Sequence, residues 1–217
     1  GLVLKSRTDE LAEHKIPYAQ SGDLTGSLLE VVRQVKPTVL IGVSKQAGSF
    51  SEEVIKEMQS HVSRPMIMAL SNPTSKSECT AEQAFRWTAG KALFASGSPF
   101  SPVTLAGKVF VPGQGNNMYI FPGVGLGAIL CHASQVTNSM FYTAAKTLSE
   151  QVTFDELEVG KLYPDLKTIR DISAQIAVAV CEVAFEEKLA QIERPLDLLS
   201  FVKQRMFLPH YVPFKAV

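Results

Sequence analysis

The sequence carries no excess of either charge. Its 21 Lys and Arg residues balance 21 Asp and Glu residues, so the formal net charge is zero. Nucleic acids and anionic membranes attract proteins mainly through a positive surface, and this composition indicates neither as a partner. With 46% hydrophobic and 19% charged residues, the 217-residue chain has the composition of a folded protein. Any anion that it binds is expected at a local site.

Cysteine and long apolar runs are also scarce. The three cysteines, Cys79, Cys131 and Cys181, contain no Cys-x-x-Cys spacing and cannot complete a disulfide framework or a zinc cluster among themselves. We expect buried free thiols in a reducing compartment. No segment approaches the roughly 20 apolar residues that cross a bilayer. The apolar stretch 119–131 is short and interrupted by proline and glycine.

The chain begins without Met, directly in the run Gly1–Leu4, which predicts a strand. A core strand is rarely the first segment of a natural protein, because its pairing partners would be missing. We therefore expect the first residue to be a break inside a domain, with a sheet that is incomplete on its N-terminal side.

Helical and strand patterns then alternate along the chain. Continuous apolar runs predict a strand covered on both faces at 38–43, a further buried strand at 65–70 and a short strand at 92–95. Helical spacing and capping residues predict helices at 24–35, 52–58 and 81–87. This alternation predicts an α/β fold: a Rossmann-like parallel sheet with helices on both faces. In such sheets ligands bind at the carboxyl ends of the strands, which the loops 44–48, 71–73 and 96–98 would form.

The pattern changes after residue 117. Segments 124–149 and 173–190 predict helices, so a mostly helical region follows the sheet. The tail from Arg194 contains three prolines and many aromatic residues. It is compatible with an extended segment on a partner surface and equally with one that folds back on its own domain. We divide the chain into a cofactor-domain part (1–116), a helical segment (117–189) and a tail (190–217).

Two polar segments are candidate binding sites. Asn72 follows a predicted strand, and its amide offers one acceptor and two donors to a hydroxy acid or a nicotinamide. The same residues suit an ordinary Asx-Pro turn, which spacing alone favours. In Gly113–Asn117, two glycines allow a ligand to approach the backbone and two amides supply hydrogen bonds. Spacing alone again favours an ordinary hairpin or a loop with left-handed residues.

Together these segments resemble the malic enzyme family in order and spacing, over essentially the whole chain as a C-terminal part. The segments that carry the resemblance are Ala69–Glu82, Phe94–Phe100, Pro112–Asn117 and Phe121–Gly123, with weaker matches at Gly160–Pro164 and Thr168–Arg170. The resemblance implies oxidative decarboxylation of L-malate to pyruvate and CO2, with NADP or NAD and Mg²⁺ or Mn²⁺. It also implies a homo-oligomer, dimer or tetramer, with the tail at the subunit interface. Cytoplasm, plastid and mitochondrion are all compatible with such an enzyme.

The resemblance assigns site residues one by one. Asn72, Asn116 and Asn117 are the implied substrate-binding residues, with Asn117 favoured for direct malate contact. Asn72 and Asn116 are also implied to contact the cofactor, as are Ser71 and Gly97 near the nicotinamide.

Lys15 bears on the choice of cofactor. It lies in the loop after the first predicted strand, where such folds meet the adenine ribose. The matching position is commonly Lys in NADP-preferring relatives and uncharged in NAD-preferring ones, so we expect NADP. A solvated surface Lys and an NAD-preferring enzyme remain the alternatives. Lys45 departs from the family pattern, since many relatives have small residues in the loop that contains it.

The chemistry that the family needs is largely missing from this chain. We find no GxGxxG turn, no clustered carboxylates for a divalent ion, and no support for a catalytic Tyr or Lys. We therefore assign no catalytic residue and no metal ligand, and expect the metal to be bound by residues outside this chain. The chain alone is expected to fold poorly and to be inactive. A non-catalytic module that binds a dinucleotide or a partner is the alternative.

Overall fold

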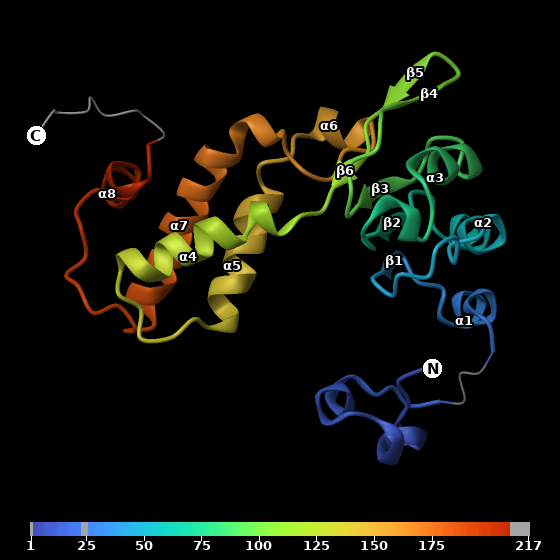
Figure 1. The fold of residues 1–217 in the computed structure, drawn as a ribbon, viewed down its shortest axis with the longest axis horizontal. Coiled ribbons are helices and arrows are strands. Elements are labelled where there is room, and N and C mark those ends of the chain that lie inside the picture. Colours follow the sequence, from blue (N-terminus) through green and yellow to red (C-terminus); the bar gives the residue numbers. More distant parts are fainter. Residues whose placement is uncertain (1, 23–25, 209–217) are drawn as a thin grey trace, which may run out of the picture. The chain divides into compact units, whose positions relative to one another are not determined.

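The computed structural model describes residues 2–22 and 26–208. The chain divides into two compact units (Figure 1). Unit 1 contains Gly1–Gly115 and Glu158–Leu162, and unit 2 contains Asn116–Leu157 and Tyr163–Val217. The chain therefore passes between the units three times.

Unit 1 opens with two short 3-10 helices, η1 (Lys5–Glu10) and η2 (Glu13–Tyr18). The strand predicted at the start of the chain is wrong. Leu4 forms only an isolated parallel bridge with Gln20, and the backbone turns into η1 at the next residue. Arg7 donates to the carbonyl of Leu2 at 2.9 Å, which holds this turn. The apolar run is too short to continue a ladder once that turn begins.

The sheet of unit 1 is parallel, as predicted, and has the order β1-β2-β3-β6. Its strands are β1 (Val39–Gly42), β2 (Met66–Ala69), β3 (Leu93–Ser96) and the two-residue β6 (Gly113–Gln114). The sequence did not predict β6, nor the antiparallel hairpin of β4 (Val103–Leu105) and β5 (Lys108–Phe110). A parallel sheet with flanking helices confirms the predicted α/β, Rossmann-like class.

Three helices of unit 1 begin at side-chain caps that the sequence contains. They are α1 (Leu28–Val35), α2 (Glu52–His61) and α3 (Ala81–Trp87), capped by Ser27, Ser51 and Thr80. Ser27 and Thr80 form capping boxes, in which the helix's third residue bonds back to the cap. α2 packs against both α1 and α3, and the three helices lie in a row beside the strands (Figure 1). A further 3-10 turn, η3, spans Thr74–Lys76.

The core of unit 1 lies on one face of the sheet. Ile67 and Phe94 are fully buried and adjacent in the ladder, where they meet Ile55 of α2 and Phe85 of α3. The opposite face of β1 is open: Ile41 is 56% exposed. The expectation that residues 38–43 are covered on both faces is therefore wrong. β1 is one of the two edge strands, and among the described residues no element covers that face of it.

Unit 2 is helical, as predicted. The helix expected over 124–149 is two helices, α4 (Phe121–Leu130) and α5 (Asn138–Ser149), because the chain turns at His132 with a positive φ of 49° and Thr137 caps α5. The second predicted helix is α7 (Ile169–Glu186), four residues nearer the N-terminus than expected. Its buried face packs against α4 and α5 (Figure 1). The shorter elements are η4 (Asn117–Tyr119), α6 (Phe154–Glu158) and η5 (Leu166–Thr168).

The tail folds back on its own unit, which was one of the two alternatives. Helix α8 (Leu198–Arg205) starts at the cap Asp197 and packs on α7. Val202 is fully buried against Ala174 and Ala177. Residues 209–217 lie outside the described residues, and the interface expected for the tail stays a prediction. No helix in the described ranges is long and apolar enough to span a membrane.

Candidate functional site

The carboxyl ends of β1, β2 and β3 bring three loops of unit 1 to one edge of the sheet. The ladder continues one residue beyond each strand: Leu70 N–H donates to Gly42 O at 2.9 Å, and Gly97 N–H to Ala69 O at 3.2 Å. These bonds fix where each loop departs. Because ligands of parallel α/β sheets bind at this end, we call residues 44–48, 70–73 and 97–98 the carboxyl edge.

Asn72 is held at this edge by a neighbouring loop. Ser98 Oγ donates to Asn72 Oδ1 at 2.5 Å, and Asn72 Nδ2 lies 3.5 Å from Leu70 O. The peptide bond from Asn72 to Pro73 is cis. The Asn72 side chain is exposed, so its amide is both oriented and open to solvent. Asn72 can therefore belong to an Asx-Pro turn and still offer its amide to a ligand, so the two alternatives from the sequence do not exclude each other.

Gly97 is the close-approach point between the loops after β2 and β3. A Cβ at this position would lie 2.3 Å from Leu70 O and 2.6 Å from Asn72 Nδ2. Any side chain would therefore displace the Asn72 loop. Gly97 thus determines where the Asn72 amide lies, whether or not Gly97 itself contacts a ligand.

Behind the edge lies a buried carboxylate that the sequence reasoning missed. Glu78 is fully buried and accepts from Ser71 Oγ at 2.5 Å and from Ser71 N at 3.4 Å. Ser71 Oγ in turn accepts the backbone N–H of Lys45 at 2.8 Å. A Cβ on Gly42 would stand 2.5 Å from Glu78 Cγ and Cδ. The one hint of burial in the sequence was the position of Glu78 between Ser77 and Cys79.

Lys45 has an unusual backbone. Its φ is 58°, in the left-handed region, which costs a residue with a side chain roughly 1–2 kcal/mol. Its side chain is exposed, and none of the described ion pairs includes it. The left-handed conformation gives a physical reason why glycine would suit this position.

The remaining predicted residues lie elsewhere. Lys15 is exposed in η2, a 3-10 helix rather than the expected loop after a strand. Asn116 and Asn117 are exposed at the start of unit 2, where Asn116 Oδ1 accepts from Met118 N at 3.0 Å. Their approach to Asn72, which belongs to unit 1, stays a prediction.

Tyr119 has a structural role. Its hydroxyl donates to Pro164 O at 2.7 Å, and its ring stacks on Tyr163 with centroids 5.3 Å apart. Burial, with a smaller contribution from Asp165, raises the pKa of Tyr119 to about 12. A phenol that is buried and committed to a carbonyl is a poor acid or base at neutral pH.

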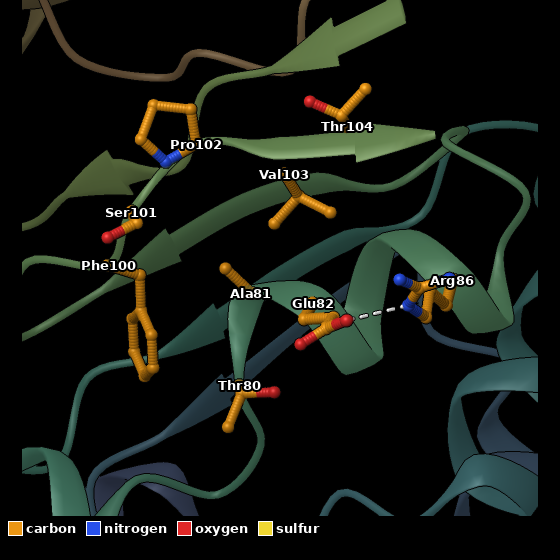
Figure 2. A pocket seen from close by; sticks show the side chains of 9 residues that line it. All are labelled: Thr80, Ala81, Glu82, Arg86, Phe100, Ser101, Pro102, Val103 and Thr104. Carbon is orange, nitrogen blue, oxygen red and sulfur yellow. Dashed lines mark hydrogen bonds and ion pairs between the residues drawn. The ribbon is translucent and has the colours of Figure 1, made fainter. Parts of the chain in front are cut away.

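The described residues do not fit a divalent metal. In the ranges 2–22 and 26–208, no three His, Cys, Asp or Glu side chains gather closely enough to hold one. A separate hollow lies between α3, from its cap Thr80 to Arg86, and the segment 100–104 (Figure 2). Glu82 and Arg86 pair at its rim at 2.8 Å. None of the predicted site residues lines this hollow, and we do not regard it as the functional site.

Comparison with known proteins agrees with the fold and the motifs. The family model described as "Malic enzyme, NAD binding domain" matches residues 1–185. The NADP-dependent malic enzyme of Dictyostelium discoideum is 56% identical over 97% of this chain and 39% of its own length. That of Populus trichocarpa is 49% identical over 97% of this chain and 36% of its own length.

A solved structure adds evidence on the fold alone. The malic enzyme of Entamoeba histolytica superposes with a TM-score of 0.73 at 20% sequence identity, covering 93% of this chain and 39% of that one. The chain thus spans about two fifths of the length of the relatives that it matches. Since the family model covers 185 of its 217 residues, the chain belongs to the malic enzyme family, within which it matches the NAD-binding domain.

Proposed function

We propose that the protein carrying this chain oxidises and decarboxylates L-malate to pyruvate and CO2 with reduction of NADP. The names of the relatives, NADP-dependent malic enzyme, support this activity. The observation that carries the proposal is the geometry of the carboxyl edge. There the exposed amide of Asn72 is oriented by Ser98 and packs against Gly97, where a side chain would displace it. When bound, NADP would accept the hydride from C2 of malate.

The residues of this chain bind and orient. Ser98 occupies Asn72 Oδ1 and Leu70 O accepts from Nδ2 at 3.5 Å, so the second Nδ2 proton is left to donate to an oxygen of malate or of the nicotinamide amide. A neutral amide can hold an anionic substrate without adding charge near the reaction centre. Ser71 and Gly97 shape the nicotinamide side of the site, and Asn116 and Asn117 would join it from unit 2.

Metal chemistry is not assigned to this chain, because its described residues hold no suitable group. We propose that Mg²⁺ or Mn²⁺ is bound by residues outside it, in a full-length enzyme that is a homo-oligomer. The chain expressed alone should then fail to reduce NADP in the presence of malate.

The test uses the full-length enzyme, with malate-dependent formation of NADPH as the readout. Asn72→Ala should lower kcat/KM for malate about 100-fold or more, the loss typical of removing an oriented polar group from a reaction centre. Glu82→Gln, on the hollow of Figure 2, is the matched control and should leave kcat/KM unchanged. Absence of turnover in the unsubstituted enzyme would overturn the proposal. NADP binding without turnover would favour the non-catalytic alternative.

The preference for NADP rests on Lys15. Its exposed ammonium, which none of the described ion pairs includes, can neutralise the 2′-phosphate of NADP. Lys15→Gln should raise KM for NADP about tenfold, worth about 1.4 kcal/mol, and leave KM for NAD unchanged. Lys5→Gln, in η1, is the control. An unaltered KM for NADP would remove the argument and reopen the NAD-preferring alternative.

A further inference from the structure

We propose that Glu78 is a positioning residue that acts through Ser71 to hold the Lys45 loop, residues 44–48, in its binding shape. Ser71 would then serve the cofactor by shaping this loop rather than by touching the ligand. The inference rests on the proposed function, since it concerns cofactor binding at the same carboxyl edge.

The first observation is a buried carboxyl group that pairs with no cation among the described residues. Glu78 is 0% exposed, and none of the ion pairs among the described residues involves it. Buried carboxylates are rare unless other groups bind their oxygens. Both Glu78 oxygens are bound by one residue, Ser71, through its hydroxyl at 2.5 Å and its backbone N–H at 3.4 Å. The carboxylate therefore fixes the rotamer of Ser71.

The second observation concerns the Ser71 hydroxyl. A hydroxyl has one proton to donate and two lone pairs. The proton goes to Glu78, and one lone pair accepts Lys45 N–H at 2.8 Å. Ser71 is only 4% exposed. Its hydroxyl thus has no proton left for a ligand and almost no surface to offer one, so its effect must pass through Lys45.

The third observation is that the segment around Glu78 holds the last residue of the Lys45 loop and the chain just after it. Gly48 N–H donates to Ser77 O at 3.2 Å, and Phe50 N–H donates to Glu78 O at 3.1 Å. The Ser71 hydroxyl attaches the other end of the loop, at Lys45. That is the position with the left-handed φ of 58°, which the chain would leave most readily.

These contacts explain why a carboxylate at 78 matters for binding. The Lys45 loop is exposed at the carboxyl end of β1, where the Lys45 ammonium can meet a nucleotide anion. A loop that is already ordered binds without a further loss of conformational entropy. Glu78 is buried against Gly42, at the end of β1 from which this loop departs, so it would influence binding without contacting the ligand.

The test is a double-mutant cycle in the full-length enzyme, with the Kd for NADP as the readout. Glu78→Gln and Ser71→Ala should each raise the Kd about tenfold, and the double variant should be no worse than the weaker-binding single variant. Tryptic cleavage after Lys45 should be faster in both single variants, and NADP should slow it. The kcat of each folded variant at saturating NADP should change much less than the Kd.

Several outcomes would overturn the inference. A folded Glu78→Gln enzyme with an unaltered Kd for NADP is one, and single effects that multiply in the double variant are another. If Glu78→Gln does not fold, Ser71→Ala tests the same contact, and an unaltered Kd there is equally decisive. Failure of the unsubstituted enzyme to bind NADP would instead count against the proposed function, so the two failures are distinguishable.

Discussion

Ser98 and Asn72 are joined by a hydrogen bond of 2.5 Å that links the loops after β3 and β2. Since Ser98 donates to Oδ1, it determines which end of the Asn72 amide is offered to a ligand. Ser98→Ala should therefore let the amide rotate and lower kcat/KM for malate about fivefold, the value of a hydrogen bond worth roughly 1 kcal/mol. Steady-state kinetics will show this. A loss as large as that of Asn72→Ala would mean that Ser98 contacts the ligand itself.

Two glycines of α4 should respond to alanine in opposite ways. A Cβ on Gly127 would lie 2.7 Å from Ala177 O and 2.9 Å from Val180 Cβ of α7, whereas one on Gly125 would meet nothing within 4 Å. Gly127→Ala should destabilise the protein by about 1–3 kcal/mol through overpacking. Gly125→Ala should leave stability unchanged or raise it by up to about 1 kcal/mol, because Ala favours helix. Denaturant unfolding measures both, and equal effects would contradict the α4–α7 packing.

Tyr119 should make the protein sensitive to alkali. The pKa of Tyr119 is raised to about 12 by burial, against about 10 in an unfolded chain. A raised pKa favours the folded state below about pH 10, and this contribution is lost as pH rises from about 10 through about 12. Tyr119→Phe should be less stable than the parent at pH 8, since it lacks the bond to Pro164 O. The difference should shrink by pH 11.

Denaturant unfolding at the two pH values measures that difference. Tyr142→Phe is the control, because Tyr142 is 73% exposed and should show no such change. A stability gap between parent and Tyr119→Phe that is the same at both pH values would contradict the prediction.

Two of the cysteines should resist alkylation in the folded protein. Burial raises the pKa of Cys79 to about 12, helped by Glu78, and that of Cys181 to about 12, helped by Cys131. At pH 8 only about one thiol in ten thousand would then be the reactive thiolate. Peptide mass spectrometry after iodoacetamide treatment should find both unmodified in the native enzyme and alkylated after unfolding. Rapid native alkylation of Cys79 would argue against a closed packing around Glu78.

Local signals predicted much of unit 1. Ser51 and Thr80 cap helices where the sequence placed them, and the apolar runs at 65–70 and 92–95 are strands. The two-residue β6 was not predictable, because its pairing with β3 depends on contacts distant in sequence. The break between α4 and α5 was missed although the cap Thr137 is visible in the sequence, because the continuously apolar pattern of α4 gives no period that marks its end.

The site was predicted to a similar extent. The grouping of strand-end loops follows from parallel topology alone, and the structure brings Asn72 and Gly97 together there. Glu78 was missed, because a glutamate in a polar segment reads as a surface residue. Its burial depends on the absence of a side chain at Gly42, which only the folded backbone shows. The roles of Lys15, Asn116 and Asn117 stay predictions.

The return of residues 158–162 to unit 1 affects how this protein can change. Val111 N–H donates to Val159 O at 2.9 Å, Lys108 Nζ donates to Glu158 O at 3.0 Å, and Gly160 lies against the ring of Phe85. A chimera that exchanged only the residues up to Gly115 would graft a sheet without these contacts. Unit 1 is thus built from two separate segments of the sequence. Substitutions before residue 116 and substitutions in residues 158–162 must remain compatible with each other.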